Sequence, residues 1–179
     1  MGSENPFGGD NQQETSSVDL APDWVVGFVD GEGCFSVSIH RNDLAKPTNG
    51  WQIQPTFQVS QHVDHVDVLH DLQSFFGCGR VRMKGKGSSV AVYLVHSTIT
   101  LEEQILPFFE RRELQVKRDD FEAFARIVRA VRRRSHHRRD IFEEIVRLAY
   151  GMNQRGKQRK RSIEEILGSS ETAREAPGD

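Results

Sequence analysis

Two carboxylates, Asp30 and Glu32, stand at the end of a segment punctuated by glycines, WVVGFVDGEG at 24–33. Pro22 suits a first helical turn, so we expect a helix over about 22–32 that ends at these acids. The C-terminal end of a helix dipole disfavours negative charge unless a cation compensates it. The pair therefore indicates either a cation site at the helix end or an acidic turn that faces solvent.

Gly27 and Gly31 lie four residues apart, on one face of the same helix. Glycine costs about 1 kcal/mol relative to alanine inside a helix, so we expect these two glycines to serve a purpose other than helix stability. A face without side chains lets a second helix approach closely. That helix can belong to the same chain, in an internal contact, or to a second copy of it.

The elements that must position these groups follow from the hydrophobic pattern. Alternation of apolar and polar residues predicts strands, and apolar residues three or four apart predict helices. Strands are expected at 34–40, 51–61, 80–84 and about 89–96, with helices at 64–76, 98–110, 118–134, 139–151 and 162–167. This order predicts an α+β domain, an antiparallel four-stranded sheet with helices on one face. The fourth strand is apolar on both faces, so its inward side cannot be assigned.

One face of this sheet is polar. Its hydroxyl, imidazole, amide and basic side chains are Ser36, Ser38, His40, Gln52, Gln54, Thr56, Gln58, Arg80, Arg82 and Lys84. Such a face can simply be solvated, as is common in antiparallel sheets. Glutamine and arginine, however, can bond base edges bidentately, and a two-stranded ribbon fits the major groove of DNA. Both interpretations stay open on the pattern alone.

Charge is distributed unevenly along the 179 residues, although the net charge is only −2. Residues 1–23 hold five acids and no base, whereas residues 111–161 hold 17 bases and seven acids. A basic body between acidic ends favours a polyanionic partner, and a solvated arginine-rich surface is the alternative. Phosphate contacts are expected from a basic loop, Arg155, Lys157, Arg159, Lys160 and Arg161.

The segment at 25–33 (VVGFVDGEG) resembles the signature motif of the LAGLIDADG homing endonucleases. The CFSVSI strand after it, the second strand ending in TFQVSQ, and the order of elements also resemble this family over about 22–167. The resemblance implies a saddle-shaped sheet (αββαββα plus C-terminal helices) over the DNA major groove. It also implies a homodimer, because the motif occurs once, with Gly27 and Gly31 at the dimer interface. The implied reaction is a metal-dependent double-strand cut in a long, pseudo-palindromic target.

The resemblance also implies site residues. Glu32 stands where the founding motif has Asp and corresponds to the metal ligand, with the Gly31 carbonyl as a second ligand; Asp30 is expected to be structural. Oxygen ligands suit Mg²⁺, for which Mn²⁺ should substitute. Gln61 matches a residue that organises active-site water, or is a strand-end hydrogen-bonding residue. Lys117 matches a basic residue that would offset charge on the phosphate, or is a surface lysine at a helix start.

Other functions stay open. The chain could be a DNA- or RNA-binding relative without cleavage, such as a maturase of intron RNA, or a scaffold that dimerises through the helix at 22–32. His62, His65 and His70 match no zinc-site spacing. Two cysteines and no apolar run long enough for a membrane span favour an intracellular protein, in a bacterial cytoplasm or an organelle. We expect disordered ends at 1–21 and at the acidic 168–179, around one domain at 22–167.

Overall fold

The computed structural model describes residues 19–168, apart from 43, 46–47, 49 and 156–160. The helices and turns are α1 (Pro22–Glu32), η2 (Val63–His65), α2 (Asp67–Phe76), α3 (Thr98–Thr100), η3 (Leu101–Ile105), α4 (Leu106–Glu110), α5 (Arg118–Arg132), η4 (Ser135–His137), α6 (Arg139–Arg155) and α7 (Ile163–Gly168). The strands are β1 (Gly33–Arg41), β2 (Trp51–His62), β3 (Arg80–Met83) and β4 (Val90–Val95). The predicted disordered ends lie outside the described residues, except for 19–21 and Gly168.

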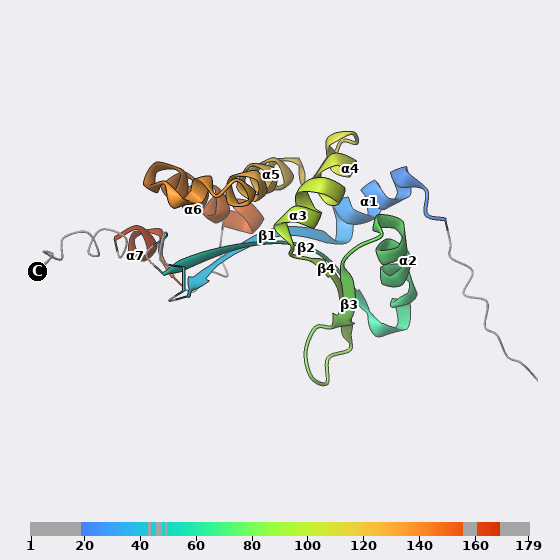
Figure 1. Ribbon diagram of the computed structural model, residues 1–179. Coiled ribbons are helices and arrows are strands. Elements are labelled where there is room, and N and C mark those ends of the chain that lie inside the picture. The colour runs from blue at the N-terminus through green and yellow to red at the C-terminus, as the bar shows by residue number, and fades with distance from the viewer. Residues whose placement is uncertain (1–18, 43, 46–47, 49, 156–160, 169–179) are drawn as a thin grey trace, which may run out of the picture.

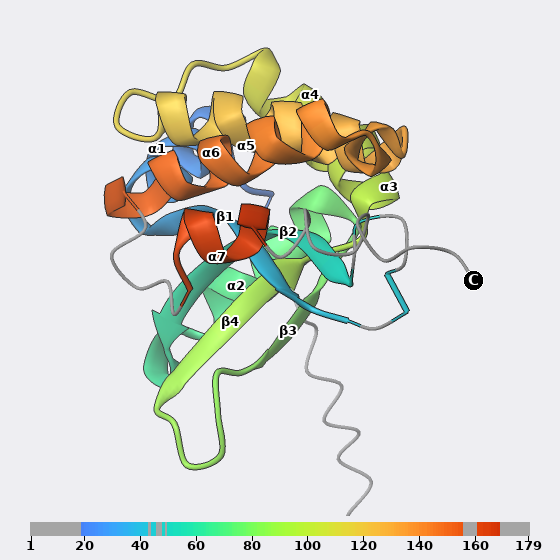
Figure 2. The ribbon, with the colours of Figure 1, turned by 90° about the vertical axis from the view of Figure 1, so that its left-hand side faces the viewer.

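The four strands form one antiparallel sheet in the order β1-β2-β4-β3, which confirms the predicted α+β architecture. Helices α1, α3, α4, α5 and α6 lie over one face of this twisted sheet (Figures 1 and 2). The β3–β4 hairpin bends away from these helices and ends in an extended loop (Figure 1). Within the described residues, no helix is long and apolar enough to cross a membrane.

The core is aromatic and centres on Phe35 of β1. Its ring packs against Phe57 and Phe121 with centroids 5.2 Å apart, Phe124 at 5.4 Å and Phe109 at 5.5 Å. These partners come from β2, α5 and α4, so one side chain joins the edge strand to two helices. Aromatic pairs in edge-to-face or offset geometry add about 0.5–1.5 kcal/mol beyond their buried area.

Strand β2 alternates as predicted: its odd-numbered residues through Val59 are buried and its even-numbered ones are partly exposed. The register extends this alternation to β4, whose inward side the sequence left open. Tyr93 lies opposite Val59 and faces the helices, whereas Leu94 lies opposite Gln58 and Arg80 on the polar face. Leu94 is only 6% exposed, because its polar-face neighbours cover it. The apolar residues of β4 are therefore buried on both faces of the sheet, by the helices on one face and by neighbouring side chains on the other.

Two predicted helices are less regular than expected. The helix predicted at 98–110 contains a π-helical turn, η3, between α3 and α4. Pro107 lies just after that turn, and its missing N–H removes one helical hydrogen bond, which is consistent with the wider turn. The helix predicted at 64–76 begins with the 3₁₀ turn η2.

Candidate functional site

The site is built on the junction between α1 and β1, where a helix passes directly into a strand. Val25 and Val29 anchor α1 in the core with no exposed surface. The Gly33 N–H donates to the Val29 carbonyl, and a Cβ at Gly33 would lie 2.6 Å from that oxygen. Only glycine fits there, so β1 can start immediately after Glu32. The Glu32 residue is consequently exposed at the helix end.

Asp30 is bonded to the segment that precedes α5. Its carboxylate accepts the backbone N–H groups of Gln115 at 3.0 Å, Val116 at 3.0 Å and Lys117 at 2.9 Å. Partial burial opposes ionisation of Asp30, but these three amides outweigh it and hold its pKa below the usual value. Asp30 therefore fixes a segment 85 residues away in the chain.

Lys117 returns to the same helix end. Its ammonium donates to the carbonyl oxygens of Asp30 and Gly31, the latter at 2.8 Å. The structure thus brings together two of the predicted site residues, Gly31 and Lys117, next to Glu32 in the chain. The sequence indicated each separately but not the contact between them.

The oxygens here fit a divalent cation only in part. The Gly31 carbonyl and the Glu32 carboxylate are hard oxygen donors, and the Lys117 ammonium on Gly31 shows that a positive charge is accommodated there. Within the described residues, however, no group of three His, Cys, Asp or Glu side chains could hold a metal ion. Among the residues that the structure describes, the predicted ligands at this helix end are therefore two, the Gly31 carbonyl and the Glu32 carboxylate.

Gln61 lies near the end of β2, opposite Ala91 of β4. Gly33 pairs with Val59, so β2 runs past the α1–β1 junction and brings Gln61 to that end of the sheet. It shares the parity of Val59 rather than that of Gln58. Gln61 therefore lies at the same end of the sheet as the α1–β1 junction, but on the face that the helices cover.

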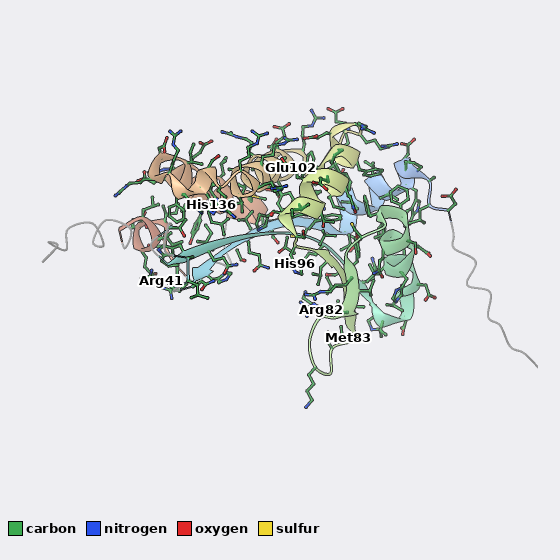
Figure 3. All side chains as sticks on the ribbon, in the orientation of Figure 1. Arg41, Arg82, Met83, His96, Glu102 and His136 are labelled. Atoms are coloured by element: carbon green, nitrogen blue, oxygen red, sulfur yellow. The ribbon has the colours of Figure 1, made fainter. Side chains whose placement is uncertain are left out.

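The predicted polar face is assembled as one surface. The register pairs Ser36 with Thr56, Ser38 with Gln54, His40 with Gln52, and both Gln58 and Arg80 with Leu94. Cross-strand partners point the same way, so these side chains share the face opposite the helices. Lys84 follows β3, and its N–H bonds the Val90 carbonyl. Figure 3 shows Arg82 and His96 on this side, and Glu102 and His136 on the other.

Some of these side chains are engaged within the chain. The hydroxyls of Ser36 and Ser38 donate to backbone carbonyls of β2 at 3.3 and 3.4 Å, and the Gln52 amide oxygen accepts from Asn42. In contrast, Arg80 and Arg82 are exposed and form no ion pair in the part of the chain that the structure describes. The two arginines are therefore the best placed to bind an external anion or base. Sequence reasoning missed Lys86, exposed on the hairpin loop beside them.

Of the predicted basic loop, Lys157, Arg159 and Lys160 lie outside the described residues, as does the side chain of Arg155. Arg161 is described, and it is tied to the domain. Its guanidinium lies 5.4 Å from the Trp51 ring centroid and pairs with Glu165. Trp51 also carries Arg41 at 4.7 Å, a contact that the sequence did not indicate.

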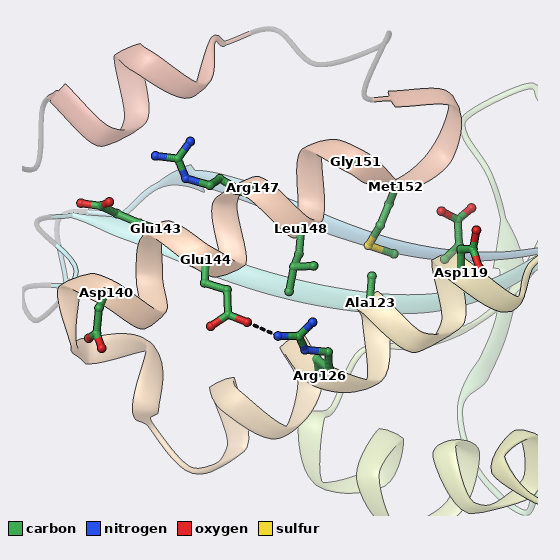
Figure 4. A pocket seen from close by; sticks show the side chains of 11 residues that line it. Asp119, Ala123, Arg126, Asp140, Glu143, Glu144, Arg147, Leu148, Gly151 and Met152 are labelled. Carbon is green, nitrogen blue, oxygen red and sulfur yellow. Dashed lines mark hydrogen bonds and ion pairs between the residues drawn. The ribbon is translucent and has the colours of Figure 1, made fainter.

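The helical side of the molecule is electrically different. Five of its arginines pair with acids: Arg126 with Glu144, Arg129 with Glu110, Arg132 with Glu102, Arg138 with Asp140, and Arg139 with Glu143. The charged residues that line a groove of about 700 Å³ between α5 and α6 are five acids and two arginines: Asp119, Asp120, Asp140, Glu143, Glu144, Arg126 and Arg147 (Figure 4). Because the acids outnumber the arginines, the groove would repel a phosphate backbone and is not a candidate DNA site.

Comparison with known proteins agrees with the fold and with the α1 motif. The family model described as LAGLIDADG endonuclease matches residues 25–128, and the chain belongs to this family. The DNA endonuclease I-CeuI of Chlamydomonas moewusii is 33% identical over 102 residues, which are 57% of this chain and 44% of that protein. The chain thus spans about half the length of the curated relatives that it matches.

Solved structures are similar over more of the chain. The homing endonuclease I-TnaI has a TM-score of 0.75 and 35% identity, covering 85% of this chain and 99% of that one. The archaeal intron-encoded homing endonuclease I-Vdi141I, solved in complex with DNA, has a TM-score of 0.76. The match covers 84% of this chain and 94% of the I-Vdi141I chain at 24% identity, so it supports the fold alone. The family is divalent-metal dependent in general.

Proposed function

We propose that this protein is a homing endonuclease that makes a site-specific, metal-dependent double-strand cut in DNA as a homodimer. The observation that carries the proposal is the end of α1, where the Lys117 ammonium binds the Gly31 carbonyl next to the exposed residue Glu32. A negative group that can hold a cation and a positive group that can stabilise a phosphate are what phosphodiester hydrolysis requires.

Glu32 and the Gly31 carbonyl would hold a divalent cation, and Mg²⁺ fits this oxygen set best, with Mn²⁺ as a substitute. Such an ion, when bound, activates water and stabilises the leaving oxygen. Lys117 would then offset charge that develops on the phosphate, and Gln61 would orient water at the same end of the sheet. Asp30 keeps Lys117 in place by accepting the backbone N–H groups of Lys117 and of the two residues before it.

Homodimer formation is supported by an apolar stripe on α1. Trp24, Gly27, Phe28 and Gly31 follow helical spacing on the side away from Val25. Trp24 is 44% exposed and stacks on Phe28 with centroids 4.7 Å apart, while a Cβ at Gly27 or Gly31 would meet no atom within 4 Å. Two copies packed through this stripe would bring two Glu32 residues near each other, one for each DNA strand. A symmetric dimer also implies a roughly palindromic target.

The polar face of the sheet would read the target. Gln54 and Gln58 can bond adenine, and Arg80 and Arg82 can bond guanine, each bidentately in the major groove. Because the substrate is DNA, the protein would act inside a cell, in a bacterial cytoplasm or an organelle.

Cleavage of the DNA formed by joining the sequences that flank the gene's own intron tests this proposal. The wild type with Mg²⁺ should cut both strands of that DNA, and Glu32→Gln should bind it with similar affinity without cutting. Glu102→Gln, an acid on the helical side, is the matched control and should cut normally. A wild type that binds this DNA tightly and never cuts it would show that the protein is a DNA-binding protein and not an endonuclease.

A further inference from the structure

Asn153, near the end of α6, has a backbone conformation that few residues adopt. Its φ is +49°, in the left-handed region, and Arg134 is the one other non-glycine residue with positive φ in the described chain. Asparagine tolerates this region better than most residues do. Such a conformation persists where surrounding contacts hold it, so the bonds of Asn153 are informative.

The Asn153 side chain binds β1. Its Nδ2 donates to the Phe35 carbonyl at 2.8 Å, and its Oδ1 accepts the thiol of Cys34 at 3.6 Å. β1 is an edge strand of the sheet and pairs with β2 alone. Asn153 therefore holds the free side of this strand to α6, at residues that closely follow Glu32.

The Asn153 backbone binds α5. Its N–H donates to the Asp120 carboxylate at 3.1 Å, and Asp120 lies in the first turn of α5, which follows Lys117. Burial, and then the charge of Asp120, raise the pKa of the Cys34 thiol above its usual value. Cys34, Asp120 and Asn153 thus form one half-buried polar cluster that connects three elements.

Phe35 is three residues past Glu32, and Asp120 is three residues past Lys117. We infer that Asn153 is a positioning residue for the proposed cleavage, because it fixes β1 and α5 and so sets the separation of Glu32 from Lys117. The inference rests on the proposed function and extends it to a residue that acts through these two groups. The Asp30 contacts hold Lys117 locally, whereas Asn153 holds the two elements that carry the pair.

Asn153→Gly is the sharpest variant, because glycine adopts positive φ freely while both side-chain bonds are removed. We expect the single-turnover cleavage rate to fall at least tenfold while the Kd for target DNA stays within threefold. Ile145→Val, a buried change on the same helix, is the control for lost stability and should keep the wild-type rate. An Asn153→Gly rate equal to that of the wild type would overturn the inference.

A second measurement does not depend on cleavage. In a Cys78→Ser background, the rate of Cys34 alkylation by iodoacetamide should rise at least tenfold in Asn153→Gly, because the thiol loses its partner. An unchanged alkylation rate would contradict the Asn153–Cys34 contact and overturn the inference. A wild type that cuts no DNA would overturn the proposed function, and the inference with it; equal cutting by wild type and variant would overturn the inference alone. If Asn153→Gly does not fold, Asp120→Ala removes the backbone contact from the other side and is read by the same two rates.

Discussion

Asp30 and Lys117 bind each other reciprocally at the end of α1, because the side chain of each contacts the backbone of the other. Asp30 accepts the Lys117 backbone N–H at 2.9 Å, and the Lys117 side chain donates back to the carbonyls of Asp30 and Gly31. The Asp30 carboxylate, which binds the backbone of 115–117, thus holds the lysine beside the predicted metal ligand Gly31. Asp30 therefore has a structural task, and of the two acids of the motif Glu32 is the one that we propose for the chemistry.

Asp30→Ala should lower the free energy of unfolding by about 1–3 kcal/mol, since three backbone amides lose a charged acceptor. The pKa of Asp30 is held below its usual value, so this carboxylate contributes stability above about pH 4, the usual aspartate range. The contribution is lost as pH falls through the lowered pKa. Urea unfolding from pH 3 to 7 should therefore show wild type and variant converging at low pH. Glu122→Gln, an exposed carboxylate on α5, should show no such convergence.

Lys117→Met should reduce the single-turnover cleavage rate by about 10²- to 10³-fold, the range for loss of one transition-state charge contact. DNA affinity should change little, because one phosphate contact at most is removed. Arg118→Met is the neighbouring control, since Arg118 pairs with Glu113 on the surface. Lys117→Met with wild-type rate would remove Lys117 from the site and favour its being a surface lysine.

Gly33→Ala should destabilise the protein by about 1–3 kcal/mol, the usual cost of overpacking, because the added Cβ meets Val29 at 2.6 Å. Gly151→Ala on α6 should stabilise instead, by about 0.5–1 kcal/mol, since a Cβ there meets nothing within 4 Å. Thermal unfolding of the two variants measures the difference. Equal melting temperatures would mean that the α1–β1 junction relaxes at no cost.

Gly27→Leu should convert a homodimer to a monomer without unfolding it. The leucine would stand in open space on the isolated chain but would separate two packed α1 helices. Sedimentation equilibrium at micromolar concentration reports the change, and Gly85→Leu in the β3–β4 loop is the control. A wild type that is already monomeric at these concentrations would contradict the dimer.

Arg80→Ala and Arg82→Ala should each relax base preference at the position read and weaken binding by about 1–3 kcal/mol. Binding to a library of randomised half-sites measures both effects. Arg138→Ala, on the helical side and paired with Asp140, should leave the preference unchanged. A uniform loss across all sites for Arg80→Ala would instead indicate a phosphate contact.

Much of this fold could be predicted from sequence because β1 and β2 alternate strictly and α1 begins and ends with clear signals. β4 could not be assigned, since Val92 and Leu94 are apolar residues on the polar face, covered by neighbours from other strands. The predicted roles of Gly31 and Lys117 at the site came only from the resemblance to a family, whereas Glu32 was also indicated by its place at the helix end. The contacts around the site could not be predicted from the sequence. The bonds of Asp30 to 115–117 and of Asn153 to β1 span more than 80 residues and produce no periodic pattern in the sequence.

The alternation of β2 has an evolutionary consequence. Residues that pack the core and residues that face outward take turns along the strand, so each outward position can mutate without disturbing a buried neighbour. A lineage whose target drifts can therefore follow it by single substitutions, each of small effect on folding. In α1, by contrast, neighbouring residues would serve the core, the proposed dimer and the proposed chemistry at once, and little variation there would be tolerated. Redesign toward a new DNA sequence should accordingly vary the even-numbered positions of β2 and leave 24–33 intact.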